Sequence, residues 1–172
     1  PFIFVFGPSG VGKTIVAKHI LGEGHVIYKQ EDLQEAFLQK IRRKRWPDAL
    51  SHSEKLILES PCYLRQRPQI LSLLQGLLRL RLRKGLRTII LDAEDFGPLR
   101  DILTSIPIEE RASLVLRFPS GRGRYRFLAF ECRKRGLPIR LAREVSELED
   151  WTYAKAFSAL EEVEAERAEA GN

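Results

Sequence analysis

Short apolar runs alternate with longer segments of helical periodicity over most of the chain. The runs are β-prone, and they predict five strands, at Phe2–Phe6, His25–Lys29, Lys55–Glu59, Thr88–Leu91 and Ser113–Phe118. Apolar residues at helical spacing predict the intervening helices, at Ile15–Leu21, Leu33–Ile41, Pro68–Lys84, Leu99–Ser105 and Tyr125–Arg135. Because parallel strands need crossover connections and helices usually supply them, the pattern predicts an α/β fold: a five-stranded parallel sheet with helices on both faces.

The composition is that of a folded protein. Of the 172 residues, 44% are apolar and 30% are charged, a balance that excludes disorder for most of the chain. The longest apolar runs are far shorter than a membrane span, and no signal segment opens the chain. We therefore expect one cytoplasmic domain with a small appendage.

Charge is unevenly distributed along the sequence. The net charge is +6, yet nine acidic residues and only two basic ones follow residue 143. Arginine-rich clusters give the remainder its positive charge, and such clusters suit phosphate-bearing partners, because a guanidinium pairs with phosphate oxygens in a bidentate manner. A solvated surface partly neutralised by the acidic tail is the alternative. The residues for which we consider contact with a DNA backbone are Arg42, Arg43, Lys44, Arg45, Arg79 and Arg83.

A phosphate-binding motif lies between the first strand and the first helix. It matches GxxxxGK[ST] at every defined position and consists of Gly7, Pro8, Ser9, Gly10, Val11, Gly12, Lys13 and Thr14. Its glycines allow backbone N–H groups to face phosphate oxygens. Lys13 would bridge the β- and γ-phosphates, and the Thr14 hydroxyl would coordinate Mg²⁺. The motif predicts binding of ATP or ADP with Mg²⁺; a plain glycine turn is the alternative.

Two strands end in an acidic residue that could complete the magnesium site. Glu59 ends the third strand and Asp92 follows the fourth. Motif shape alone favours Asp92. In a sheet whose third strand supplies the magnesium acid and whose fourth carries a γ-phosphate sensor, Glu59 is the acid and Asp92 the sensor. Chain order favours this second assignment, although either carboxylate could instead cap the following helix.

These residues resemble the AAA+ domain of the DnaA/Hda replication-initiator branch, with helicase loaders of the DnaC type as relatives. The resemblance extends over about residues 1–150, and the motif at Gly7–Thr14 is its specific part. The other segments match only in their order along the chain and in their general type of residue. They are His25–Leu33, Leu56–Leu64 (Walker B), Arg87–Asp95 (sensor 1) and Arg126–Leu137. The resemblance implies an AAA+ P-loop domain over residues 1–140 and a helical lid remnant or acidic tail over 141–172.

The departures from the family pattern bear on activity. Ser60 stands where the family has a second acid that polarises the attacking water, which implies weak or absent hydrolysis. Arg111 is the candidate arginine finger, with Arg117 as a second choice. A serine also replaces the sensor-2 arginine, for which Arg143 could substitute.

Three functions remain open on this reading. The first is a nucleotide-dependent switch in the initiation of DNA replication or its regulation, which docks another AAA+ subunit or a replication protein. The second is a small-molecule P-loop kinase that recruits Asp92 and the arginines Arg122, Arg124 and Arg126. The third is an interaction module with a vestigial nucleotide site.

Overall fold

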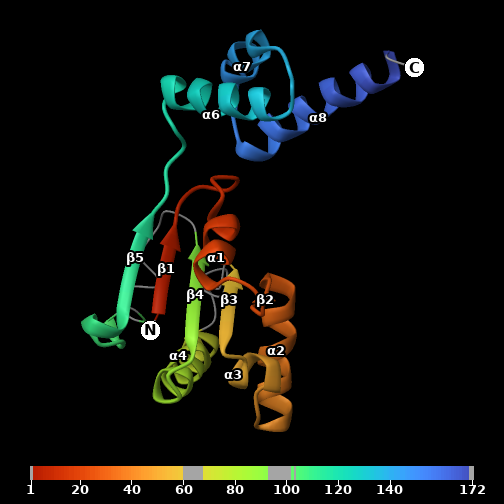
Figure 1. Cartoon of the computed structure of the whole chain (residues 1–172). Coiled ribbons are helices and arrows are strands. Elements are labelled where there is room, and N and C mark those ends of the chain that lie inside the picture. The colour runs from red at the N-terminus through yellow and green to blue at the C-terminus, as the bar shows by residue number, and fades with distance from the viewer. Residues whose placement is uncertain (1, 60–67, 93–101, 103, 171–172) are drawn as a thin grey trace. The chain divides into compact units, whose positions relative to one another are not determined.

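The computed structural model describes residues 2–59, 68–92, 102 and 104–170, and the chain forms two compact units (Figure 1). Unit 1 is Pro1–Leu116 and unit 2 is Arg117–Asn172. The division precedes the helix that begins at Gly121, because this helix shares its core with the C-terminal helices. The boundary expected after residue 140, between a nucleotide-binding domain and a lid remnant or tail, stays a prediction.

Unit 1 is built on a parallel sheet of five strands. They are β1 (Phe2–Phe6), β2 (Val26–Tyr28), β3 (Lys55–Glu59), β4 (Arg87–Asp92) and β5 (Arg111–Val115), in the order β2-β3-β4-β1-β5. Every neighbouring pair is parallel, so all carboxyl ends lie at one edge. This confirms the predicted fold class.

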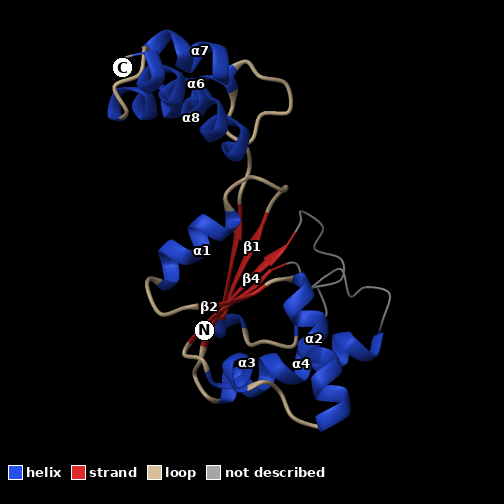
Figure 2. Ribbon diagram, turned by 90° about the vertical axis from the view of Figure 1, so that its right-hand side faces the viewer, coloured by secondary structure: helices blue, strands red, loops and turns tan. Residues whose placement is uncertain are grey.

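Helices cover both faces of this sheet (Figure 2). One face packs against α1 (Lys13–Leu21), and the other against α2 (Gln30–Arg43), α3 (Asp48–His52) and α4 (Pro68–Arg83). Successive strand residues point to opposite faces. Phe2, Phe4 and Phe6 accordingly join the core under α2 and α4, while Val5 joins the core under α1.

Some elements differ from the sequence-based prediction. The fifth strand begins at Arg111, two residues earlier than predicted, because Arg111 and Ala112 pair with β1 but lack an apolar signal. The short helix α3 was not predicted. The helix expected at Leu99–Ser105 lies mainly outside the described residues.

Unit 2 is helical and consists of α6 (Gly121–Lys134), α7 (Ile139–Ser146) and α8 (Tyr153–Ala170). Leu128, Cys132, Trp151 and Leu160 are in its buried core. Aromatic rings meet edge to face there; the centroids of Trp151 and Tyr153 are 4.9 Å apart. Helix α6 begins before the predicted Tyr125, since Gly121 and Gly123 weaken the helical signal. Among the described residues, no helix is both long and apolar enough to cross a membrane.

Candidate functional site

The loop between β1 and α1 has the backbone of an anion-binding turn. Gly10 and Gly12 have φ values of 76° and 90°, in the left-handed region that side chains disfavour. Gly12 caps α1, whose first turn contains no acidic residue. The N–H groups at this helix start are therefore oriented to receive a negatively charged group.

The first glycine of the loop is fixed between two strand ends. Gly7 N donates to Asp92 O over 3.3 Å, and Leu116 N donates to Phe6 O over 2.8 Å. Gly7 has a φ of 151°, and a Cβ added to it would lie 2.5 Å from Leu116 O. Only glycine fits there without a backbone shift, so this position is constrained by packing as well as by phosphate chemistry.

The Lys13 side chain lies back over the loop. Its Nζ donates to Gly7 O over 2.6 Å and to Pro8 O over 2.8 Å. The ammonium is thus held above the loop, close to where the motif predicts phosphate oxygens. These two carbonyls are the acceptors that phosphate oxygens would replace.

Thr14 is joined to Glu59 across the sheet edge. Thr14 Oγ1 donates to Glu59 Oε1 over 2.8 Å, between the first turn of α1 and the end of β3. A hydroxyl beside a carboxylate supplies the hard oxygen ligands that Mg²⁺ prefers. The donor set therefore fits the magnesium ion expected with a nucleotide.

Asp92 ends β4, the strand between β1 and β3. It is 5% exposed, and its register partner is Phe6, the residue before the loop. The structure therefore brings both predicted acids to the loop edge, and it is Glu59 that bonds to Thr14.

Other predicted residues lie elsewhere. Arg111 pairs with Phe2 at the amino edge of the sheet, opposite the loop of its own chain. Arg143, on α7, forms a 3.4 Å ion pair with Glu147. Ser60 is outside the described residues, and Arg117 is the first residue of unit 2. The basic residues considered for DNA contact are exposed, at the end of α2 and beyond it or on α4: Arg42, Arg43, Lys44, Arg45, Arg79 and Arg83.

Sequence reasoning missed a buried arginine in unit 1. Arg81 is 0% exposed, and its guanidinium donates to Leu50 O, Ser53 O, Arg87 O and Thr88 Oγ1 over 2.8–3.0 Å. Burial lowers the pKa of Arg81 to about 10, so the group is still charged at neutral pH. A signal was present: Leu74, Leu77, Leu78 and Arg81 follow the spacing of a buried helix face.

Together, the sheet order, the loop and the Thr14–Glu59 pair define a P-loop α/β fold of the AAA+ type. No protein-family model matches the chain, and no curated protein sequence does. Solved structures do match, at low identity, so they establish the fold.

The similar structures include DnaA and ORC2 proteins. Domain III of DnaA from Thermotoga maritima has a TM-score of 0.75 at 12% identity, covering 99% of this chain and 78% of that one. A replication initiator DnaA bound to AMPPCP and single-stranded DNA has a TM-score of 0.73 at 12% identity, with 99% and 59% covered. ORC2 from Aeropyrum pernix has a TM-score of 0.63 at 18% identity, with 98% and 57% covered. The chain thus spans less than two thirds of the last two. The predicted resemblance to the DnaA branch is confirmed at the level of the fold.

Proposed function

We propose that the chain binds ATP or ADP with Mg²⁺ and acts as a nucleotide-dependent switch in the initiation of DNA replication or its regulation. The observation that carries the proposal is the 2.8 Å hydrogen bond between Thr14 Oγ1 and Glu59 Oε1. This contact supports the proposal because the two side chains expected to bind magnesium lie next to each other, close to the motif Gly7–Thr14. The DnaA structure with AMPPCP supports the choice of an adenine nucleotide.

Each residue of the site has a role in this proposal. Lys13 Nζ would exchange its two loop carbonyls for β- and γ-phosphate oxygens. Thr14 and Glu59 would hold the magnesium ion, which neutralises phosphate charge when bound. Asp92 would sense the γ-phosphate from β4.

The proposed switch would operate at the two points where β3 and β4 end beside the phosphate loop. Glu59 and Asp92 are the last residues of neighbouring strands, and both lie at the loop edge. A change at the γ-phosphate would act on these two carboxylates. The changed loop edge would dock another AAA+ subunit or a replication protein, and Arg111 would serve as the finger in a neighbouring subunit.

Hydrolysis would be weak or absent. Ser60 follows Glu59 where a second acid would polarise the attacking water, and a serine hydroxyl is no base at neutral pH. We expect steady-state ATP turnover below about 1 per second without a partner, which is the lower end of the usual range for enzymes. Faster turnover in a phosphate-release assay would contradict this part of the proposal.

The exposed basic residues of α2 and α4 would contact a DNA backbone without reading its sequence. Support comes from the initiator structure that contains single-stranded DNA. A fluorescence-anisotropy titration tests the idea: Arg42→Ala/Arg43→Ala should weaken oligonucleotide binding equally for unrelated sequences. Unchanged affinity would remove these residues from the proposal.

Calorimetry tests the nucleotide site directly. ATP, ADP and GTP are titrated with Mg²⁺ into the wild type, Lys13→Ala and the matched control Lys18→Ala, an exposed lysine of the same helix. Lys13→Ala should weaken ATP binding by at least about a hundredfold, because it removes charge-assisted hydrogen bonds to the phosphates. Lys18→Ala should have no effect, and equal affinities would show that Gly7–Thr14 is only a turn.

The same titrations distinguish the two acids. Glu59→Gln should remove most of the dependence of ATP affinity on Mg²⁺, whereas Asp92→Asn should reduce the preference for ATP over ADP and leave the metal dependence intact. The reverse pattern would make Asp92 the metal ligand, which contradicts the proposed assignment and favours the kinase alternative.

A further inference from the structure

Unit 2 is strongly divided in charge although it is almost neutral as a whole. Residues 117–143 contain nine basic residues and one acidic residue, and residues 144–172 contain nine acidic residues and two basic ones. The first set lies on α6, on α7 and before them, and the second mainly on and around α8. A small unit with separate positive and negative regions attracts copies of itself.

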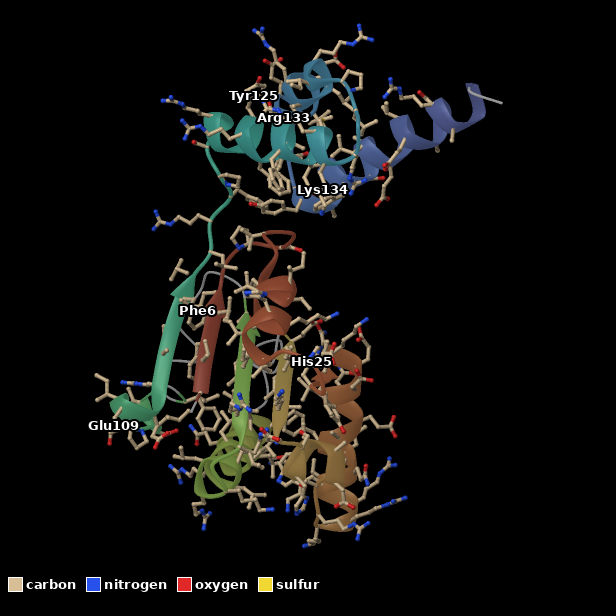
Figure 3. All side chains as sticks on the ribbon, in the orientation of Figure 1. Phe6, His25, Glu109, Tyr125, Arg133 and Lys134 are labelled. Carbon is tan, nitrogen blue, oxygen red and sulfur yellow. The ribbon has the colours of Figure 1, made fainter. Side chains whose placement is uncertain are left out.

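The positive region contains an ordered surface on α6. Arg122, Arg126, Phe130 and Lys134 recur every fourth residue and are all exposed, so they form one line along the helix. Arg133 adjoins this line, and its side chain and that of Lys134 are labelled on α6 in Figure 3. We call these five residues the α6 basic stripe. Phe130, at the centre of the line, is 63% exposed and offers a phenyl ring that a partner could cover.

The negative region contains a matching surface on α8. Glu161, Glu162 and Glu166 are exposed, and they follow Leu160, the last fully buried side chain in the part of that helix whose burial is described. We call these three residues the α8 acidic end. Among the described side chains none of the three forms an ion pair, and the same is true of the α6 basic stripe.

Part of each surface opposes the dipole of its own helix. Helix α6 has Arg122 and no acid in its first turn, where the dipole is positive, whereas its last turn carries favourable basic residues; Glu166 lies towards the negative end of α8. Such charges destabilise an isolated helix, and so do like charges four residues apart, as at Arg122 and Arg126. A partner of opposite charge would reverse both penalties.

The two surfaces do not neutralise each other within one copy. The helices pack through Leu128, Cys132, Ala156 and Leu160, which are buried, and the ion pair that joins them is Arg135–Glu164 at 3.0 Å. The basic stripe and the acidic end lie outside that packed core. Their complementarity is therefore available to another molecule.

We propose that the α6 basic stripe of one copy binds the α8 acidic end of a second copy of this chain. Guanidinium and ammonium groups pair with the glutamates, and Phe130 packs on Ala165 and the glutamate methylenes. A nucleic acid would suit the basic stripe alone and would be repelled by the acidic end, whereas a second copy accounts for both surfaces. The proposal does not depend on nucleotide binding.

Sedimentation velocity of the whole chain tests the association. At about 50 mM salt the weight-average mass should rise above 19.8 kDa with concentration, and at about 0.5 M salt it should return to that value, because screening weakens exposed charge pairs. A mass of 19.8 kDa at every concentration and salt would overturn the proposal.

Paired charge reversals test which surfaces meet. Arg126→Glu/Lys134→Glu and Glu162→Lys/Glu166→Lys should each weaken self-association by about tenfold or more. An equimolar mixture of the two variants should associate again, because each reversed surface then meets its complement. The control Lys18→Glu/Lys84→Glu makes the same net charge change as the first variant at exposed residues of unit 1, and it should associate like the wild type.

Far-ultraviolet circular dichroism verifies that each variant remains helical. Two further results would overturn the proposal: a mixture that stays monomeric although both variants are folded, or a wild-type chain that stays monomeric while a single-stranded oligonucleotide binds through the stripe. The second result would assign the stripe to nucleic acid.

Discussion

The two units of the chain organise their polar residues in different ways. In unit 1 parallel strands bring Gly7, Glu59 and Asp92 to one edge of the sheet, so the chemistry is concentrated where the backbone leaves the core. In unit 2 aliphatic residues and Trp151 form the core, further aromatic rings pack around it, and the charged residues are sorted by sign over the helices. The contrast teaches that the first unit is specified by backbone geometry at a few positions, and the second by the distribution of charge over a surface.

The largest expected loss of stability is at Arg81, a buried charge whose hydrogen-bond acceptors are carbonyls and a hydroxyl. Arg81→Leu leaves carbonyls of Leu50, Ser53 and Arg87 without a donor, so it should lower the free energy of unfolding by about 3 kcal/mol. The measurement is urea unfolding followed by fluorescence in a Trp151→Phe background, where Trp46 reports on unit 1 alone.

The matched control for Arg81 is on the same helix. Arg79→Leu alters an exposed side chain two residues away and should change the free energy of unfolding by no more than about 0.5 kcal/mol. An equal change in the free energy of unfolding at the two positions would mean that the buried hydrogen bonds of Arg81 do not stabilise unit 1.

A smaller loss of stability is expected at Gly7, where the backbone geometry requires glycine. Gly7→Ala should destabilise unit 1 by about 2 kcal/mol, because its Cβ would lie 2.5 Å from Leu116 O. Gly85→Ala is the control: Gly85 also has a positive φ, 66°, at the end of α4, but a Cβ there meets nothing within 4 Å, so the expected cost is about 1 kcal/mol. If thermal unfolding ranked Gly85→Ala as the more damaging, the packing role of Gly7 would be wrong.

The smallest effect is expected in unit 2. Trp151 is 3% exposed, and its Nε1 has no hydrogen-bond partner, so the indole N–H contributes a desolvation cost. Trp151→Phe keeps a ring against Phe118 and Tyr153 and should cost only about 1 kcal/mol, whereas Trp151→Leu loses both edge-to-face contacts and should cost more. Circular dichroism during thermal unfolding compares the two variants, and an equal cost would exclude an aromatic contribution.

The sequence predicted unit 1 well because its signals are local. A parallel strand buried on both faces is a short apolar run, and the phosphate loop requires particular residues at particular spacing. The helix α3 was missed since five residues carry too little periodicity. Chain order favoured Glu59 over Asp92 as the magnesium acid, and the hydrogen bond from Thr14 to Glu59, which no sequence pattern shows, supports that proposal. The burial of Arg81 among arginines that are exposed also depends on what packs against α4.

Unit 2 was harder to predict for a physical reason. Its helices were expected from the sequence. That α6 belongs to unit 2 depends on side chains of α7 and α8, which pack with those of α6 in one core. The composition of the C-terminal segment already showed that it is acidic. Only the structure shows which of its glutamates are exposed after Leu160. Surface arrangement of this kind is a property of packing, and a linear pattern does not contain it.

The hydrogen bonds of Arg81 also have a consequence for how unit 1 assembles. Its acceptors at Leu50 and Ser53 are 31 and 28 residues away along the chain, so they are in place only after α3 and α4 have met beside the first residues of β4. Before this contact forms, the free energy of the guanidinium is lower in water than in the interior, because its acceptors are not yet in place. We therefore expect its burial to follow the rate-limiting step, so that changes at Arg81 accelerate unfolding and leave the folding rate nearly unchanged in stopped-flow experiments.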